Sequence, residues 1–271
     1  MLFIISLAVK FLIGVILLHS TMTQQELHFN PLGKLVASIT NPIYMNILKM
    51  TKKRTDTLAP VFILILIVFY ALLLTLFGAG NILWSFFYSL TDILRFLLLF
   101  YLIAVLVGST VNRFGNTAYS TFFYRLALPW VKMTRSVVNL PGNAVIVPTI
   151  IVLFVIFIAV MTALQIGLGL IASSAVNPVV AIKGAAAASI TVLIQLVTMF
   201  TWLIIIRALM SWVSPDPRNG VVQFVTAMTD PVIEPFRRVI PPLGFIDISP
   251  IILLVLLYFV KIMLVRLIAL L

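Results

Sequence analysis

The chain has 271 residues, of which 63% are hydrophobic and 9% are charged, and its mean hydropathy is +1.24. Soluble domains carry about 25% charged residues, so this composition excludes a soluble globular protein and indicates a polytopic membrane protein. The net charge of +11 fits basic loops that contact anionic lipid head groups, with no direct binding of nucleic acid. The sequence contains no cysteine, which excludes disulfides, thiolate metal sites and cysteine catalysis.

Six apolar stretches come close to the about 20 residues that a helix needs to cross a bilayer. The third can begin anywhere from Ser85 to Thr91, with Asp92 and Arg95 near its start. The first lacks a basic leading region and a clear cleavage site, so we interpret it as a retained span. The expected fold class is therefore all-α, a polytopic membrane protein with about six transmembrane helices. The stretches cover Leu2–Leu18, Leu58–Phe77, Ser85–Gly108, Val145–Ile171, Ala185–Met210 and Ile248–Leu271.

The connections between these stretches alternate in charge. Residues 19–57, 111–144 and 211–247 each hold several lysines or arginines, whereas residues 78–84 and 172–184 contribute only Lys183. Lysine and arginine in short loops set the orientation of a membrane protein. The pattern therefore predicts that the three basic connections lie in the cytoplasm and that both termini face the other side.

The three basic connections also share a spacing. Each has an asparagine, a central proline 12 or 13 residues later, and a second proline 18 or 19 residues beyond that. This spacing predicts three units of span, amphipathic loop and span, at residues 1–80, 81–173 and 184–271, related as parallel repeats. The first two units lack the SWxxPxP and PPxG elements of the third and are degenerate copies. The matched positions are Asn30, Pro42 and Pro60; Asn116, Pro129 and Pro148; and Asn219, Pro231 and Pro250.

The third basic connection predicts a short amphipathic helix. Asp230 and Pro231 are typical of an N-cap followed by proline at the first helical position, and Pro241–Pro242 should stop the helix. Glu234 and the basic pair Arg237–Arg238 lie off its apolar face. A helix of this kind beside a span suggests a position in the lipid interface, lying flat or dipping inward. The apolar face is formed by Val232, Ile233, Phe236, Val239 and Ile240.

The same connection carries a dense motif, which runs from the helix before Arg207 to the helix after Pro250. Its members resemble the signature of the YggT/YlmG family of small integral membrane proteins. The motif is formed by Arg207, Ser211–Trp212, Pro215, Pro217, Asn219, Thr229–Asp230–Pro231, Pro235, Arg237–Arg238, Pro241–Pro242, Gly244, Asp247 and Ser249–Pro250.

This resemblance implies a multi-pass protein of the bacterial inner membrane. Members of the family are associated with osmotic-stress tolerance and potassium homeostasis, with cell division, and in plastids with nucleoid distribution and haem attachment to a cytochrome. A third unit departs from the one or two units usual in the family. The resemblance implies a functional or fold-defining polar set of Arg207, Asn219, Asp230, Arg237, Arg238 and Asp247.

Roles for this polar set follow from residue chemistry. Asn219 and Asp230 are expected to cap or terminate helices. Arg207 should reach the interface, where loop carbonyls or the carboxylates of Asp216 and Asp247 are available. The arginine pair is expected to contact phosphates of lipid or an acidic partner. The motif prolines that punctuate the set are Pro215, Pro217, Pro231, Pro235, Pro241, Pro242 and Pro250.

Two lysines, Lys10 and Lys261, fall near the middle of predicted spans. A charge at that depth usually faces a bundle interior or a water path, which suggests an ion-path or proton-linked role. The alternative is that the long stem carries the ammonium to a polar group elsewhere. No acid is an evident midplane partner for either lysine, and Asp92 is expected to pair with Arg95, three residues further along its helix.

The remaining histidines and glycines do not indicate a catalytic, metal-binding or phosphate-binding site. His19 and His28 could ligate a metal or haem, but solvated single histidines are the more common case. Gly78–Gly80 and Gly167–Gly169 lack the context of a phosphate-binding loop and fit helix ends or close helix approach. The sequence contains no catalytic triad or metal-ligand cluster. We therefore expect a non-enzymatic protein, with no catalytic, cofactor-binding or metal residues.

Two functions are consistent with these features. The first is a scaffold or assembly factor in membrane and cell-envelope organisation, which acts through the proline-rich motif on lipid and on a membrane or division-assembly protein. The alternative is an osmotic-stress or ion-homeostasis protein that affects potassium or proton movement. A haem-handling factor would be a third class and would require His19 and His28. The sequence leaves the oligomeric state open.

Overall fold

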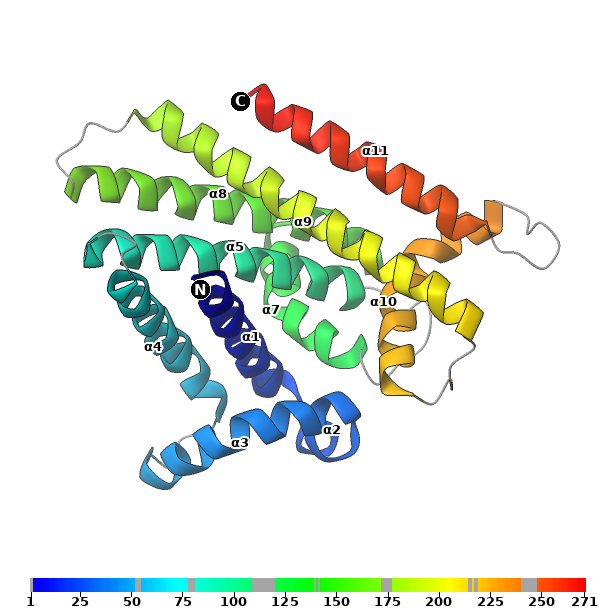
Figure 1. Ribbon diagram of the computed structural model, residues 1–271, viewed down its shortest axis with the longest axis horizontal. Helices are drawn as coiled ribbons and strands as arrows, with labels where there is room; N and C mark the ends of the chain where they lie inside the picture. The colour runs from blue at the N-terminus through cyan, green and yellow to red at the C-terminus, as the bar shows by residue number, and fades with distance from the viewer. Residues whose placement is uncertain are drawn as a thin grey trace. The chain divides into compact units, whose positions relative to one another are not determined.

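The computed structural model describes residues 2–51, 55–77, 81–108, 120–138, 140, 142–171, 177–213, 216, 219–239 and 248–271, and within these it contains helices and no strands (Figure 1). This confirms the all-α fold class. The helices are α1 (Leu2–Thr21), α2 (Gln24–Phe29), α3 (Pro31–Thr51), α4 (Thr55–Leu76), α5 (Ile82–Gly108), α7 (Ser120–Val137), the short 3₁₀ turn η1 (Gly142–Val145), α8 (Ile146–Ile171), α9 (Pro178–Val213), α10 (Gly220–Val239) and α11 (Ser249–Ala269).

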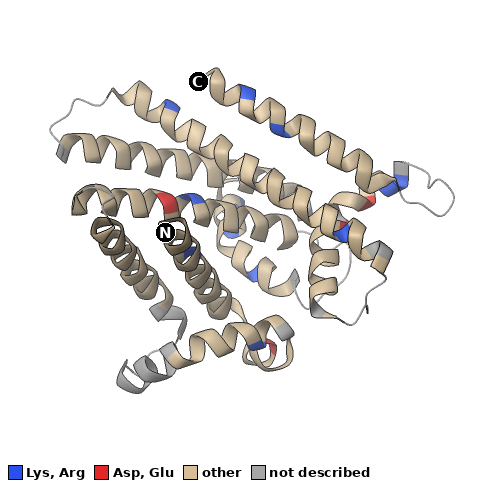
Figure 2. Cartoon of the chain, in the orientation of Figure 1, with Lys and Arg blue, Asp and Glu red and all other residues tan. Residues whose placement is uncertain are grey.

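Six of these helices are long and apolar enough to cross a membrane, which confirms the six predicted spans. Charged residues are sparse along them (Figure 2). Many of their large apolar side chains are exposed, as expected for surfaces that face lipid. The spanning segments are Leu2–Thr21, Ala59–Leu76, Ile82–Gly108, Ile146–Leu170, Pro178–Met210 and Ser249–Ala269.

The third span begins earlier than any of the predicted starting points. The side chain of Asn81 accepts a hydrogen bond of 2.9 Å from the Trp84 backbone N–H, which caps α5 at Ile82. Asp92 therefore lies well inside the helix rather than near its start.

The fifth span is also longer than predicted. Asn177 accepts a hydrogen bond of 2.9 Å from the Val179 N–H and starts α9 at Pro178. Proline suits this position because the first turn of a helix has no partner for its N–H. Lys183 consequently lies in the helix and not in a loop.

The described chain forms two compact units. The first comprises Met1–Phe100 with Ala163–Ala175, and the second comprises Tyr101–Thr162 with Val176–Leu271. In the first unit α1 packs against α3 and α4, and α2 packs against α3. Its apolar core joins α1, α4 and α5 through residues that include Ile13, Tyr70 and Ile93.

The second unit contains a matching arrangement of two spans and an amphipathic helix. Here α9 packs against both α10 and α11, and α10 also contacts α11. The three helices meet in a buried cluster of Ile204, Ile233 and Leu253. Apolar contact therefore holds α10 against the two spans that flank it in the sequence.

The predicted start of the amphipathic helix at Asp230–Pro231 is wrong. Helix α10 begins at Gly220 and runs through both residues to Val239. Asn219 is the residue that caps it, because its side chain accepts a hydrogen bond of 2.9 Å from the Val221 N–H. The role of Asn219 as a capping residue is thus confirmed, whereas Asp230 lies in the helix interior.

Helices α3 and α10 share local geometry as well as spacing. Asn30 caps α3 through its side chain at 2.9 Å, as Asn219 caps α10. Thr40 and Thr229, each two residues before the central proline, are buried and donate a hydrogen bond of 2.8 Å to the carbonyl four residues earlier. The three-unit repeat stays a prediction, and Asn116 in the second unit lies outside the described residues.

Candidate functional site

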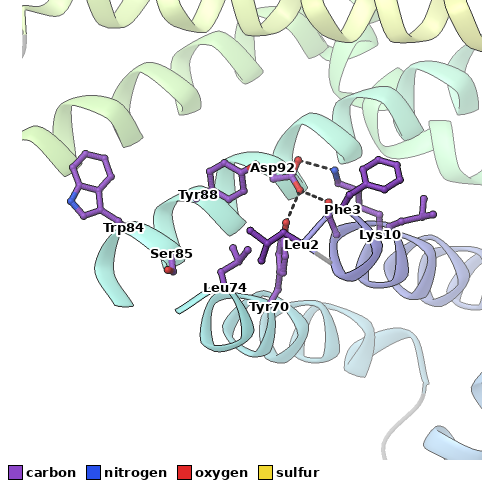
Figure 3. A pocket seen from close by; sticks show the side chains of 11 residues that line it. Leu2, Phe3, Lys10, Tyr70, Leu74, Trp84, Ser85, Tyr88 and Asp92 are labelled. Carbon is purple, nitrogen blue, oxygen red and sulfur yellow. Dashed lines mark hydrogen bonds and ion pairs between the residues drawn. The ribbon is translucent and has the colours of Figure 1, made fainter. Parts of the chain in front are cut away.

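A polar cluster lies inside the spans of the first unit. The Lys10 ammonium on α1 is 2.7 Å from Oδ1 of Asp92 on α5. The Ser6 hydroxyl donates to Asp92 Oδ2 at 2.8 Å, and the Tyr70 hydroxyl on α4 donates to the same oxygen at 3.2 Å. Figure 3 shows Lys10 from α1 and Tyr70 from α4 pointing toward the Asp92 carboxylate on α5.

Helix geometry explains this convergence. Ser6 and Lys10 are four residues apart and therefore share a face of α1. Tyr70 and Ile93, next to Asp92, belong to the apolar core that joins α1, α4 and α5. Packing of that core brings the polar groups of three helices together, and the lysine and carboxylate neutralise each other, as charges within a membrane usually do.

Two predictions about these charges are wrong. Asp92 pairs with Lys10 and not with Arg95, although Arg95 lies on the same helix, and Lys10 does have an acidic partner in its span region. The physical reason is the earlier start of α5, which places Asp92 at the depth of Lys10. Residues that are 82 positions apart in the sequence meet only through the packing of two helices.

A pocket of about 740 Å³ lies beside the cluster, between α1, α4 and α5 (Figure 3). Lys10, Tyr70 and Asp92 form its polar wall, and most of the remaining lining is apolar or aromatic. Sequence reasoning missed Ser6 and Tyr70. The signal that could have found Ser6 was its spacing of four residues from Lys10, which marks a polar stripe on an otherwise apolar helix.

The second polar site joins α9 to α10. Arg207 Nη2 lies 3.6 Å from Asp230 Oδ1, so that the carboxylate that meets Arg207 is Asp230 rather than Asp216. The distance is that of an ion pair beyond hydrogen-bond length, and Arg207 Nε and Asp230 Oδ1 are buried without a hydrogen bond. Burial raises the pKa of the Asp230 carboxyl above its ordinary value, while Arg207 and Arg237 act to lower it.

A basic pair stands at the C-terminal end of α10. Arg237 and Arg238 are both exposed, and Arg238 Nε lies 3.4 Å from Glu234 Oε1, one helical turn earlier. The Arg238 side chain is 72% exposed, so the contact with Glu234 leaves most of it accessible. Cations at a helix C-terminus are favoured by the helix dipole, and accessible guanidinium groups bind phosphate and carboxylate.

The other motif residues have varied positions. Pro231 lies inside α10, Pro235 is exposed on it, and Pro250 is buried at the start of α11. Asp247 and four motif prolines lie outside the described residues, as do Gly78–Gly80 and the predicted helix stop at Pro241–Pro242. The four prolines are Pro215, Pro217, Pro241 and Pro242.

Lys261 has a different environment from Lys10. It lies half-buried on α11 beside a small pocket of about 200 Å³ that Trp202 and Tyr258 also line. Within the described part of the chain, no ion pair joins Lys261 to a carboxylate. The two intramembrane lysines therefore differ in their charged surroundings.

The two histidines are each engaged by hydrogen bonds. His19 is buried and its Nδ1 lies 2.6 Å from Thr40 Oγ1, so it is not the solvated histidine that the sequence suggested. Thr40 directs its single hydroxyl proton to a backbone carbonyl, and His19 Nδ1–H is therefore the donor. His28 is exposed, with Nδ1 2.8 Å from the Gln24 carbonyl oxygen. No group of three or more metal-ligating side chains occurs among the described residues.

The second polar site lies in a region with known relatives. The CCB3/YggT family model matches residues 186–268, which contain most of α9, all of α10 and all but the last residue of α11. Residues 186–268 are therefore similar to the CCB3/YggT family, and we refer to them as the YggT region. The Arg207–Asp230 pair and the basic pair lie within the YggT region, whereas the Lys10–Asp92 cluster lies outside it.

The curated relatives match the same YggT region over part of their length. Uncharacterized protein YggT of Escherichia coli (strain K12) is 40% identical over 60 residues, which are 22% of this chain and 31% of that relative. Uncharacterized protein PA0392 of Pseudomonas aeruginosa is 40% identical over 53 residues, which are 20% and 27% of the two chains. An uncharacterized protein in the proC 3′ region of Vibrio alginolyticus is 37% identical over 54 residues, 20% and 29%.

The match therefore covers less than a third of each of these relatives. No solved structure matches the chain. The similarity supports a multi-pass membrane protein and assigns no activity to it.

Proposed function

We propose that this chain is a non-catalytic, multi-pass inner-membrane protein that acts as a scaffold or assembly factor through α10. The observation that carries the proposal is that this helix is both anchored and accessible. It is held to α9 and α11 by the cluster of Ile204, Ile233 and Leu253. Its last turn presents the exposed pair Arg237–Arg238.

The anchoring makes α10 suited to presenting a binding surface. Apolar contact and the Arg207–Asp230 ion pair both fix the helix to the spans. Because the helix is already held in place, binding to its exposed edge does not have to order it, and this favours affinity.

The binding partner is an acidic membrane or division-assembly protein, or the anionic head groups of the bilayer. Arginine forms strong, paired hydrogen bonds with carboxylate and phosphate. The predicted orientation places the connection that contains α10 in the cytoplasm, where anionic lipids attract basic segments. Relatives of the YggT region in bacteria support a bacterial membrane as the location.

Photocrosslinking in vivo tests this proposal. A photoreactive residue at the exposed Pro235 should form crosslinks to an acidic protein or to lipid. Arg237→Ala with Arg238→Ala should reduce them about tenfold or more, because each lost charge-assisted hydrogen bond contributes about 1.5–3 kcal/mol. The amount of protein inserted in the membrane should stay unchanged.

A second basic pair supplies the matched control. Lys132→Ala with Arg135→Ala removes the same charge from exposed positions of α7 and should leave the crosslinks intact. Crosslinks that survive the loss of Arg237 and Arg238, or that fall equally in the α7 variant, contradict the proposed role of α10.

The alternative function is an effect on potassium or proton movement. The observation that favours it is the Lys10–Asp92 pair with its adjoining pocket inside the spans. Purified protein in liposomes should then conduct potassium or protons, and Lys10→Leu should abolish the flux. Absent flux, or flux indifferent to Lys10→Leu and Lys261→Leu, rules this alternative out.

A further inference from the structure

The pocket beside Lys10 and Asp92 is a site that the proposed scaffold role leaves unexplained. It lies in the first unit and outside the YggT region, so it stands independently of α10. Its volume of about 740 Å³ is within the range of about 300–1,000 Å³ that is usual for pockets that bind small molecules. Its walls come from three helices, as Figure 3 shows.

The polar wall of the pocket lies deep in the span region. Lys10 is eight residues from the start of α1 and Asp92 is ten residues from the start of α5. At about 1.5 Å per residue, these positions lie roughly 12 to 15 Å along their helices, about half of a hydrocarbon core of roughly 30 Å. A molecule that enters the pocket at this depth from the bilayer must be soluble in lipid.

The Asp92 carboxylate accepts three hydrogen bonds from the side chains around it. Its Oδ1 accepts from Lys10, and its Oδ2 accepts from both Ser6 and Tyr70. The hydroxyl protons of Ser6 and Tyr70 are thereby used. Lys10 and Asp92 also cancel in charge, so the pocket favours a ligand without net charge.

Lys10 and Ser85 can still donate hydrogen bonds to a ligand. An ammonium group has three N–H donors, and Lys10 uses one of them within the described part of the chain. Ser85 also lines the pocket, is 1% exposed, and its Oγ has no hydrogen-bond partner. A buried hydroxyl without a partner is unfavourable, and a ligand with an acceptor oxygen would satisfy it.

Aromatic side chains provide the apolar part of the site. Phe3, Trp84 and Tyr88 line the pocket, and their rings can pack against a flat or chain-like apolar body. We propose that this pocket binds a neutral, lipid-soluble molecule with two acceptor oxygens, a carbonyl oxygen that accepts a hydrogen bond from Lys10 and a second oxygen that accepts one from Ser85, which lies two turns of α5 before Asp92. Two sources share this chemistry, namely the acyl ester of a membrane lipid and a free lipophilic quinone.

Each residue then has a defined part in binding. Lys10 donates to the carbonyl with an N–H that Asp92 does not occupy, and Ser85 donates to the second acceptor oxygen of the ligand. Asp92 keeps the ammonium neutralised, while Ser6 and Tyr70 orient the carboxylate. Tyr70 and Ser6 are positioning residues, because they act on the ligand only through Asp92.

Fluorescence quenching tests whether the pocket binds a free quinone. The full chain in detergent, with Trp130, Trp202 and Trp212 changed to Phe, retains Trp84 as its single tryptophan. Decylubiquinone should quench Trp84 saturably. Lys10→Met with Asp92→Asn, which removes both charges together, should weaken binding at least about tenfold, and Ser85→Ala should weaken it severalfold. The control is Lys261→Met, which changes a lysine beside a different pocket. This variant should bind decylubiquinone as the parent protein does.

Native mass spectrometry tests whether the pocket binds the acyl ester of a membrane lipid. Dioleoylphosphatidylcholine carries ester carbonyls, and its ether-linked analogue lacks them while keeping the chains and head group. The parent protein should retain the ester lipid in preference to the ether lipid, and this preference should disappear in Ser85→Ala and in the double variant. Helix content and size-exclusion profiles establish that the variants are folded.

The two experiments together distinguish a quinone from a lipid ester as the ligand. Saturable quenching without a preference for the ester assigns the pocket to a free quinone-like carbonyl, and the converse assigns it to a lipid ester. Either result supports the proposal if it depends on Ser85 and on the Lys10–Asp92 pair. Binding that is non-saturable in both experiments, or that is equal in the parent and in folded Ser85→Ala and double variants, overturns it.

Discussion

Replacing Asp92 by leucine should lower the free energy of unfolding by about 3 kcal/mol or more, because it leaves the Lys10 ammonium without its counter-ion among apolar helices. Lys10→Leu should cost less. The carboxylate that it leaves behind still accepts hydrogen bonds from Ser6 and Tyr70, whereas the ammonium has no second partner within the described residues.

The double variant Lys10→Leu with Asp92→Leu should recover most of the loss. Removing both charges eliminates the unpaired ion, and replacing such a pair by apolar residues is often close to neutral. Unfolding of the purified protein in detergent, followed by circular dichroism, provides the four free energies of a double-mutant cycle. A large favourable coupling energy is the expected result, and additive losses would show that the two residues do not interact.

A further variant distinguishes the Lys10–Asp92 pair from the Asp92–Arg95 pair that the sequence spacing predicted. If Arg95 were the partner of Asp92, adding Arg95→Leu to Asp92→Leu would restore stability. The structure predicts that it does not, because the group left unpaired is Lys10. Recovery by Arg95→Leu equal to that by Lys10→Leu would contradict the observed geometry.

The spans and the fold class could be predicted from the sequence because both depend on local composition. A run of apolar residues long enough for the hydrocarbon core must be helical, whatever surrounds it. The Lys10–Asp92 pair could not be predicted in the same way. It depends on the residue at which α5 begins, and capping by Asn81 moved that start by several residues.

The start of α10 shows how one local signal outweighed another. Asp230–Pro231 is typical of a helix start, and a proline inside a helix costs one backbone hydrogen bond. Upstream of it, however, Val225 and Met228 are buried, and Ile233 continues the buried face beyond the proline. Burial of an apolar face across the whole helix outweighs that single hydrogen bond.

The resemblance to the YggT/YlmG family identified Arg207 and Asp230 as motif residues, but it did not reveal that their side chains are in contact. They are separated by the end of α9, several residues outside the described part of the chain, and half of α10. Their contact at 3.6 Å follows from the packing of α10 on α9, which the apolar cluster around Ile233 determines. Motif residues can be found from a sequence, but their partners require the fold.

Gly33→Ala should destabilise the first unit by about 2–3 kcal/mol, although alanine is the better helix former. A Cβ at Gly33 in α3 would collide with the Glu26 carbonyl oxygen and would lie 2.7 Å from its carbon and 2.9 Å from Leu27 Cα. All three are backbone atoms of α2, which cannot move aside as a flexible side chain can.

Helix α2 is also held in place from its own N-terminus. Thr23 and Glu26 form a reciprocal capping box, with the Thr23 N–H donating to Glu26 Oε2 at 2.7 Å, and Leu27 is buried. An added methyl group must therefore separate α2 from α3 or break the cap. Because α3 also carries Thr40, which bonds to His19 on α1, a shift of α3 would strain that contact as well.

Gly167→Ala in α8 is the matched control for this substitution. A Cβ there would meet no atom within 4 Å, so the gain in helix propensity, up to about 1 kcal/mol, is unopposed. Thermal unfolding in detergent should therefore move in opposite directions for the two glycines. Equal stabilisation by both alanines would mean that α2 and α3 are not in close backbone contact, and that the corner leading from α1 to the first amphipathic helix is held by its side chains alone.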